Sequence, residues 1–329
     1  MSDIPSTMRA MTIREPGGPE GLAMAEVATP SPAPNQILVK VTAAGVNGPD
    51  LLQRRGHYPP PPGASELLGL EVTGEVVALG SEAQRWTVGD RICALTHGGG
   101  YGEYVAIDWD HAIVLPEGAS EVDAAGLPET VFTVWTNLFF RHEIAAGANL
   151  LVHGGAGGIG STAIQLGRAM GTSVFTTVSN DDAAEFVASL GATRAINYKT
   201  EDFVDVLRDV GGADLILDIV GGDYIARNFK AARHDARIVQ LAFNQGFKVD
   251  INLMPVMLKR LTYTGSTLRS RPADFKAAVA ADVERNVWPM IASGAYKCVT
   301  HSVLPLEEAA EAHRLMEASG HRGKIILTM

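Results

Sequence analysis

The pattern of apolar and polar positions changes character about a third of the way along the chain. From residue 8 to about residue 125, short apolar runs are separated by Gly and Pro, which is typical of strands joined by turns. The expected strands cover residues 37–43, 70–79, 91–95 and 104–106, and a short helix is expected at 51–55. This part of the chain is therefore predicted to be a β-rich domain, in the form of a partly open barrel.

Beyond Glu121 the pattern alternates between short apolar runs and segments with helical periodicity, which is typical of parallel strand–helix–strand units. Expected strands are 150–153, 174–178, 194–197, 215–218, 237–242 and 261–264, and expected helices are 124–143, the segment after the glycine turn described below, 181–190, 201–209 and 223–232. Six such strands complete a doubly wound parallel sheet.

The chain continues past this sheet with a long predicted helix at 272–293, a strand at 299–304, a helix at 306–318 and a last strand at 324–327. Since the open sheet is already complete, we expect these elements to return to the first domain. The predicted class is α/β, with residues 1–125 completed by 268–329 as one domain and 126–267 as the other.

A glycine turn follows the first strand of the predicted sheet. Gly155, Gly157 and Gly160 form G-x-G-x-x-G, in which the glycines allow a tight turn, close approach of a pyrophosphate and close packing of helix on strand. A packing turn without a ligand is the alternative, but a strand before the turn, a helix after it and a second strand at 174–178 favour a dinucleotide site. The predicted contacts are Gly155, Ala156, Gly157, Gly158, Ile159 and Gly160.

Composition narrows the possible partners. The 329 residues carry a net charge of −10 and contain no block of Lys and Arg, which argues against a nucleic acid or an anionic membrane as partner. The two cysteines, Cys93 and Cys298, are far apart in sequence and indicate neither a disulfide framework nor a cysteine-based zinc site. No secretory signal or membrane span is recognisable, so we expect a cytoplasmic protein.

Further motifs are spread over nearly the whole chain. They include Gly-Gly-Pro-Glu at 17–20, the run from Gln53 to Ser65, Leu-Gly-Leu-Glu at 68–71, Pro128-Glu129, Asn-Tyr-Lys at 197–199, Leu-Arg-Ser-Arg at 268–271 and Gly-Lys-Ile at 323–325. With these motifs the sequence resembles the zinc-independent, zeta-crystallin-like quinone oxidoreductase branch of the medium-chain dehydrogenase/reductase superfamily. The resemblance implies a GroES-like catalytic domain, a Rossmann domain, an active site in the cleft between them, NADPH-dependent reduction of quinones and a homodimer.

The residues at the zinc-ligand positions of that superfamily differ from those of its alcohol dehydrogenases. Asn47 stands where the first Cys ligand would be, and Leu70 replaces the His of Gly-His-Glu. Because leucine cannot bind zinc, we expect metal-free catalysis. His97 lies in a glycine-rich loop with no partner ligand nearby in sequence, and His153 is expected to be a satisfied histidine at a strand end.

The resemblance also assigns residues to the catalytic and nicotinamide sites. Asn47 and Tyr58 are candidate catalytic and cofactor-contacting groups, although Asn47 could be a left-handed turn residue and Tyr58 a packed loop aromatic. Thr133 is a candidate nicotinamide contact or a core helix residue. Neither Tyr58 nor His57 is assigned as a general acid, because solvent can protonate a hydroquinone anion. Backbone contacts to the cofactor are expected from Phe243, Asn244, Gln245, Ser266, Thr267 and Leu268.

The choice of dinucleotide depends on the end of the second strand. Ser179 occupies the position at which NAD enzymes carry an acid for the ribose hydroxyl, and Tyr198 and Lys199 match positions near a 2′-phosphate. Asp181 and Asp182 would repel that phosphate, or they could simply form a helix start. NADPH is the predicted cofactor, with NADH as the alternative.

The sequence thus predicts NADPH-dependent, metal-free quinone reduction in a homodimer. Two alternatives stay open: an enoyl or alkenal reductase acting on a C=C bond, and a non-catalytic NADPH-binding protein, since a fold does not dictate an activity.

Overall fold

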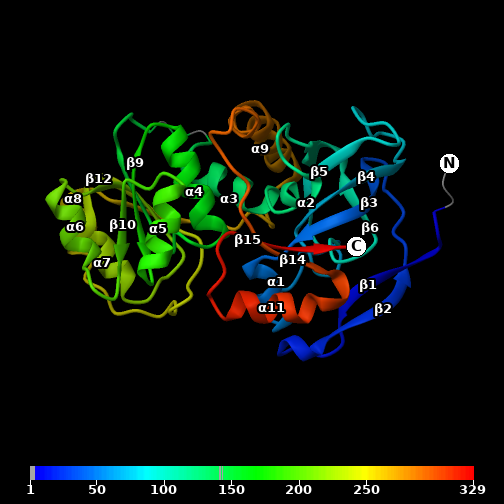
Figure 1. The fold of residues 1–329 in the computed structure, drawn as a ribbon, viewed down its shortest axis with the longest axis horizontal. Coiled ribbons are helices and arrows are strands. Elements are labelled where there is room, and N and C mark those ends of the chain that lie inside the picture. The colour runs from blue at the N-terminus through cyan, green and yellow to red at the C-terminus, as the bar shows by residue number, and fades with distance from the viewer. Residues whose placement is uncertain (1–3, 141, 143) are drawn as a thin grey trace. The chain divides into compact units, whose positions relative to one another are not determined.

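The computed structural model describes residues 4–140, 142 and 144–329 (Figure 1). The chain divides into two compact units. Unit 1 comprises the residues up to Phe132 together with Arg269–Met329, and unit 2 comprises Thr133–Leu268. Both ends of the chain therefore belong to unit 1.

Unit 2 is built on a six-stranded parallel sheet, as predicted. The strand order is β10 (Arg194–Asn197), β9 (Ser173–Val178), β8 (Asn149–Val152), β11 (Ala213–Asp218), β12 (Ala232–Gln240) and β13 (Thr262–Gly265). The first strand, β8, lies between β9 and β11, so the order reverses beside it. In sheets of this kind, ligands bind at the carboxyl ends of the strands next to such a reversal.

The helices of unit 2 are α4 (Gly158–Ala169), α5 (Asp181–Ser189), α6 (Phe203–Asp209), α7 (Tyr224–Ala231) and α8 (Met254–Lys259). Helix α3 (Pro128–Leu138) is divided between the units, since unit 2 begins at Thr133. The predicted helix at 124–143 is wrong as one element. Two helices, α2 (Glu121–Ala124) and α3, take its place, and the chain between them around Gly126 is not helical. Helix α3 begins at Pro128, because proline fits the first turn of a helix but not its interior. The predicted end at Glu143 lies outside the described residues. Helix α8 was not predicted.

Unit 1 is β-rich. Its main sheet has the strand path β14 (Thr300–Pro305), β15 (Lys324–Thr328), β3 (Gln36–Gly45), β4 (Glu71–Leu79), β5 (Arg91–Leu95) and β7 (Ala112–Val114), and β6 (Tyr104–Asp108) also pairs with β3. The carboxyl-terminal strand β15 pairs antiparallel with β3, with Ile326 opposite Gly45 (Figure 1). The last segment of the chain therefore completes the sheet that the first segment begins.

The other elements of unit 1 differ in detail from the prediction. Two paired strands, β1 (Thr7–Ile13) and β2 (Leu22–Ala28), were missed. The predicted helix at 272–293 is interrupted at Val287, giving α9 (Ala273–Asn286) and α10 (Trp288–Ala292), because Pro289 fits only the start of a new helix. The remaining elements are α1 (Gly48–Arg54), α11 (Ala309–Glu317) and the short 3₁₀ turns η1 (Pro19–Gly21), η2 (Trp109–His111) and η3 (Leu306–Glu308).

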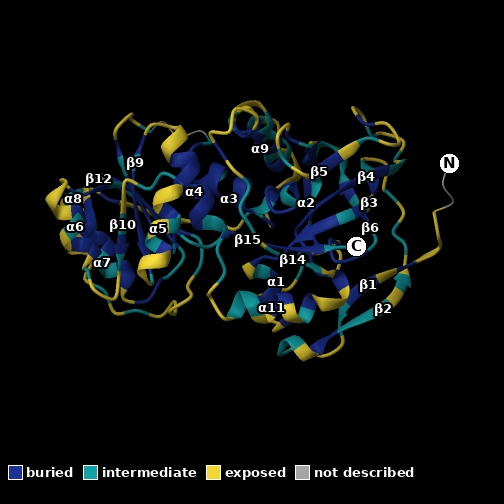
Figure 2. Ribbon diagram, viewed as in Figure 1, coloured by how far each residue is buried: buried dark blue, intermediate teal, exposed yellow. Residues whose placement is uncertain are grey.

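Burial follows the sheets (Figure 2). Strands β8 and β11 are almost entirely buried, in keeping with a parallel sheet that is covered on both faces. Helix α8 is the opposite case, since none of its residues is buried. Among the described residues, no helix is both long enough and apolar enough to cross a membrane.

Candidate cofactor and substrate sites

The glycine turn joins β8 to α4 at the carboxyl edge of the parallel sheet. Helix α4 begins at Gly158, with Gly157 in extended conformation as its N-cap. A Cβ on Gly160 would lie 2.2 Å from the carbonyl oxygen of Gly154 and 2.6 Å from Cα of Gly155, so only glycine lets the helix approach the turn this closely. The first turn of α4 carries no acidic residue. Its free amides and helix dipole therefore suit a pyrophosphate, and the residues present fit a dinucleotide.

A buried polar chain lies directly beneath this turn. The amide of Gly154 donates to Oγ1 of Thr177 at 3.2 Å, and the same oxygen lies 3.1 Å from Nδ1 of His153. Nε2 of His153 lies 2.8 Å from the side-chain oxygen of Asn228, whose amide nitrogen donates to Asp218. Burial lowers the pKa of His153. The imidazole is thus a satisfied strand-end group, as the sequence predicted.

The end of β9 holds the residues on which the choice of dinucleotide depends. Asn180 is the N-cap of α5 and accepts a hydrogen bond from the amide of Ala183 at 2.8 Å. Asp181 and Asp182 form the first turn of that helix, and Asp181 accepts from Asn197 at 3.0 Å. The helix-start interpretation of the two acids is therefore correct. The two acids nevertheless follow Ser179 by only two and three residues in the sequence.

Tyr198 and Lys199 follow β10, which neighbours β9 in the sheet. The ring of Tyr198 is largely exposed, and the amide of Lys199 donates to the side-chain oxygen of Asn197 at 3.2 Å. The structure thus brings Ser179, Tyr198 and Lys199 to adjacent strand ends, at the same edge of the sheet as the glycine turn.

Two loops at this edge are tied to each other. The amide of Gln245 donates to the carbonyl of Val220 at 2.8 Å, that of Asn244 donates to Ile219 at 3.3 Å, and that of Gly222 donates to Gly246 at 2.8 Å. Phe243 precedes these contacts and is partly exposed. The loop predicted to contact the cofactor is therefore held against the loop after β11.

The remaining candidates of unit 2 lie around α3 and the end of β13. The carbonyl of Thr133 accepts from the side chain of Asn137 at 2.8 Å, and the side-chain oxygen of Asn137 accepts from Ser266 at 2.9 Å. Thr267 is exposed and Leu268 is half-buried. Thr133 and Ser266 are thus linked through one amide side chain.

Asn47 lies in unit 1, where it is the N-cap of α1 in extended conformation, so the left-handed turn considered from the sequence is wrong. Its amide nitrogen donates to Glu71 at 2.8 Å and to the carbonyl of Gly45 at 3.3 Å, and its oxygen accepts from Nζ of Lys324. Lys324 also forms an ion pair with Glu71 at 2.7 Å. All three side chains are buried, and the amide of Asn47 is directed into this cluster.

Asp50 extends the cluster toward the turn that contains Leu70. Its carboxylate accepts from the amides of Asn47 at 2.9 Å and Gly69 at 3.0 Å. Burial raises the pKa of Asp50 to about 6, because the charged form loses hydration. The sequence missed the role of Lys324. The available signal was a single lysine at the start of the otherwise apolar run Ile-Ile-Leu at 325–327.

Tyr58 is half-buried, and the guanidinium carbon of Arg269 lies 5.5 Å from the centre of its ring. Arg269 donates to the side chain of Gln53 at 2.8 Å and, through two nitrogens, to the carbonyl of His97 at 3.1 and 2.7 Å. Burial raises the pKa of Tyr58, so its phenol is protonated near neutral pH. Arg269 was not predicted as a site residue, although it belongs to a motif that carried the family resemblance.

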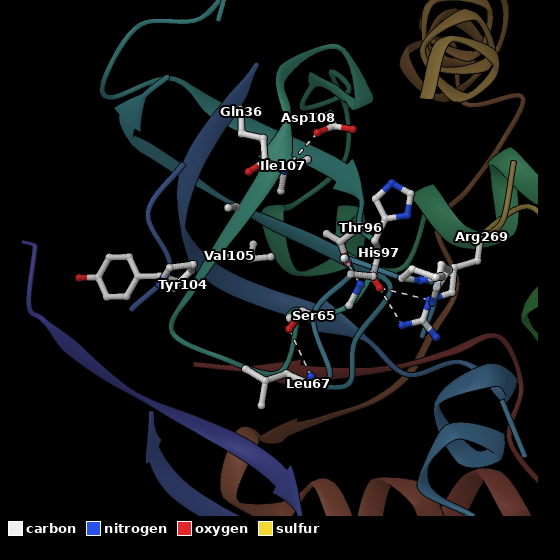
Figure 3. A pocket seen from close by; sticks show the side chains of 18 of the residues that line it. Gln36, Ser65, Leu67, Thr96, His97, Tyr104, Val105, Ile107, Asp108 and Arg269 are labelled. Atoms are coloured by element: carbon white, nitrogen blue, oxygen red, sulfur yellow. Dashed lines mark hydrogen bonds between the residues drawn. The ribbon is translucent and has the colours of Figure 1, made fainter. Parts of the chain in front are cut away.

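A pocket of about 570 Å³ opens in unit 1 beside Arg269 (Figure 3). Ser65, Thr96, His97, Asp108 and Arg269 contribute to its lining. His97 lies in a loop, as the sequence predicted, and its side chain meets residues from other elements of unit 1. Asp108 and His111 lie close enough to His97 for one atom of each to fall within 4.8 Å of the others.

Comparison with known proteins agrees with this architecture. Residues 33–117 match the family model for the alcohol dehydrogenase GroES-like domain, and residues 158–284 match that for zinc-binding dehydrogenase. The chain is 32% identical over 333 residues to quinone oxidoreductase of Homo sapiens, covering 98% of both chains.

Solved structures give the same result. A quinone oxidoreductase of Escherichia coli complexed with NADPH has a TM-score of 0.85 and 28% identity, covering 98% of this chain and all of the other. An NAD-dependent alcohol dehydrogenase has a TM-score of 0.87 and 27% identity, with the same coverage. The fold and the dinucleotide turn define a nicotinamide-dependent oxidoreductase of the medium-chain dehydrogenase/reductase superfamily. Within that superfamily, the chain belongs to the quinone oxidoreductase family.

Proposed function

We propose that this protein is an NADPH-dependent quinone oxidoreductase that needs no catalytic metal. The observation that carries the proposal is the near full-length similarity to quinone oxidoreductases, combined with Asn47 and Leu70 at the positions of zinc ligands. Reduced nicotinamide supplies a hydride when bound. A quinone is already electrophilic and becomes an aromatic hydroquinone on reduction, so placement of the reactants contributes most of the rate enhancement.

Different residues of the chain bind the cofactor and position the substrate. The α4 N-terminus and the turn from Gly155 to Gly160 hold the pyrophosphate, and the tied loops that include Phe243, Asn244 and Gln245 line the same edge. Thr133 and the segment 266–268 border the nicotinamide. In this proposal Tyr58 contacts the substrate and donates a hydrogen bond from its protonated phenol, with Arg269 fixing its position. Asn47 is held in place by Glu71 and Lys324, and as the N-cap it fixes the position of the start of α1.

Quinone reduction is tested by following NADPH absorbance with several benzoquinones and naphthoquinones. We expect saturable turnover, and a Tyr58→Phe variant that still binds NADPH but has a higher KM for quinone. No oxidation with any quinone would refute the proposal. Turnover with enoyl thioesters or alkenals alone would instead indicate reduction of C=C bonds, and NADPH binding without any turnover would indicate a non-catalytic protein.

Cofactor preference is tested by titrating NADPH and NADH against protein fluorescence. Ser179 leaves room for a 2′-phosphate, with Tyr198 and Lys199 nearby, so NADPH should bind more tightly. Asp182→Lys should strengthen NADPH binding about three- to tenfold by replacing repulsion with attraction, and should leave NADH nearly unchanged. Equal effects on both dinucleotides would contradict this placement of the phosphate.

The homodimer predicted from the resemblance is proposed to form through β13 and α8. In the described part of the chain, β13 pairs only with β12, so its outer edge is available to another strand. Large apolar side chains are exposed on the adjoining segment: Phe247 (70%), Leu253 (61%), Met257 (66%) and Leu258 (62%). Two copies related by a twofold axis would pair their edge strands and cover these side chains.

A further inference from the structure

Three side chains of unit 1, those of His97, Asp108 and His111, converge beside the pocket that His97 and Asp108 line. His97 comes from a glycine-rich loop, Asp108 ends β6 and His111 ends the 3₁₀ turn η2. One ligand atom of each lies within 4.8 Å of the others. Imidazole nitrogen and carboxylate oxygen are the donors that Zn²⁺ and neighbouring divalent metals accept.

The orientation of His111 is fixed by a second hydrogen bond. Its Nε2 lies 3.0 Å from the carbonyl of Ala273 and donates to it, so Nδ1 of the neutral ring carries the lone pair. Metal-binding histidines commonly donate their other ring N–H to a carbonyl in this way. Nδ1 lies 3.7 Å from Oδ2 of Asp108, which is too long for a hydrogen bond.

Asp108 is oriented in the same manner. Its Oδ1 accepts from the side chains of Asn35 at 3.3 Å and Gln36 at 3.1 Å, and the latter bond is drawn in Figure 3. Oδ2 is thereby directed toward Nδ1 of His111. Nδ1 of His111 and Oδ2 of Asp108 are both acceptors, so a cation between them would stabilise this arrangement. Two ligands bound to one metal at about 2.0 Å lie about 3.3 Å apart, which is close to the separation observed.

Lys276 places a positive charge against the imidazole ring of His97. Its side chain is 3% exposed, and Nζ lies 3.1 and 3.3 Å from the two ring nitrogens of His97 and 3.2 Å from the carbonyl of Arg269. No carboxylate of the described residues lies within ion-pair distance of this ammonium. The ammonium group of Lys276 therefore balances charge in the group formed by His97, Asp108 and His111, although it forms no ion pair with any described residue.

We propose that His97, Asp108 and His111 form a binding site for a divalent transition metal such as Zn²⁺, and that the ammonium group of Lys276 competes with the metal. His97, Asp108 and Lys276 line the pocket, so a ligand in the pocket can reach the remaining coordination position. Burial and the neighbouring ammonium lower the pKa of His97 to about 4, which leaves its imidazole unprotonated near neutral pH.

Isothermal titration of the chelator-treated, full-length protein with Zn²⁺ tests the proposal. We expect one Zn²⁺ to bind per chain at neutral pH. Lys276→Met should tighten this binding at least tenfold. The reason is that methionine fills a similar space but carries no charge that competes with the metal.

Variants of the ligands provide the second measurement. His97→Gln and Asp108→Asn should each weaken Zn²⁺ binding in the Lys276→Met background at least tenfold, and the matched control His234→Gln, an exposed histidine of unit 2, should change it less than twofold. Co²⁺ should give visible absorption bands of four-coordinate geometry that both ligand variants lose. Unchanged affinity in Lys276→Met, or binding that survives Asp108→Asn, would overturn the proposal.

Discussion

Lys324 neutralises a carboxylate that has no contact with solvent. Glu71 is fully buried and accepts hydrogen bonds from Asn47 and from the amide of Glu129, while Lys324 supplies the positive charge. Replacement as Lys324→Met should destabilise the protein by about 3–5 kcal/mol, because an uncompensated charge stays buried. Urea denaturation measures the loss. The double variant Glu71→Gln, Lys324→Met should recover part of it, and an unchanged midpoint in the single variant would contradict the assignment.

His313 gives the protein a defined acid sensitivity. Its Nδ1 lies 3.1 Å from Nη1 of Arg54 and its Nε2 lies 3.2 Å from the hydroxyl of Tyr101, and burial lowers its pKa to about 3. Since the unfolded value is about 6.5, this group contributes stability above pH 6.5 that is lost as pH falls toward 3.

The loss attributable to His313 is about 2 kcal/mol between pH 7.5 and 5. Glutamine can accept from Arg54 and donate to Tyr101, so His313→Gln should keep the hydrogen bonds and lose this pH dependence. Urea denaturation of both proteins at pH 7.5, 6 and 5, followed by tryptophan fluorescence, measures the difference. Parallel curves against pH would show that His313 is not the group responsible.

At this scale the sequence could not predict the contacts between distant residues. The family resemblance singled out Asn47, but its partner Lys324 lies 277 residues away, and no local pattern connects the two. The neighbours of His97 could not be predicted, because Asp108, His111 and Lys276 come from other elements. His153 was predicted correctly because a strand end before a glycine turn already specifies a buried environment.

At the scale of elements, the glycine turn makes the strictest steric demand. Gly160→Ala would place a Cβ 2.2 Å from the carbonyl oxygen of Gly154, so the backbone of the turn must shift. We expect dinucleotide affinity to fall at least tenfold and stability to fall by about 1–3 kcal/mol. Fluorescence titration and thermal unfolding provide the two readings. Gly320→Ala, where a Cβ meets nothing within 4 Å, is the matched control and should behave as wild type.

The centre of the sheet of unit 2 was predictable because β8 and β11 are short, largely apolar runs between turn residues. Helix ends were less predictable, and both helices that were predicted too long are interrupted next to a proline, at Pro128 and Pro289. The strands β1 and β2 carry no strong alternation, and their pairing with each other depends on the turn between them. No residue of helix α8 is fully buried, and its exposed side includes several apolar side chains, so the sequence shows no clear amphipathic pattern there.

For the whole molecule, the exposed apolar surface around α8 predicts the state of association. Met257→Asp together with Leu258→Asp should convert the proposed dimer into a monomer, because two charges per copy would be buried at a symmetric interface. Light scattering coupled to size-exclusion chromatography measures the mass. Val88→Asp, at an exposed apolar residue of unit 1, is the control. A wild-type protein that is already monomeric would refute the proposed interface.

The pairing of β15 with β3 also determines the order in which the chain can fold during synthesis. The ribosome releases unit 2 as one uninterrupted segment, Thr133–Leu268, so that unit can fold as soon as it emerges. Strand β3 leaves the ribosome much earlier, but its neighbour β15 is made almost 300 residues later, since Ile326 pairs with Gly45. The edge of β3 that faces β15 must therefore stay unpaired until β15 has been made.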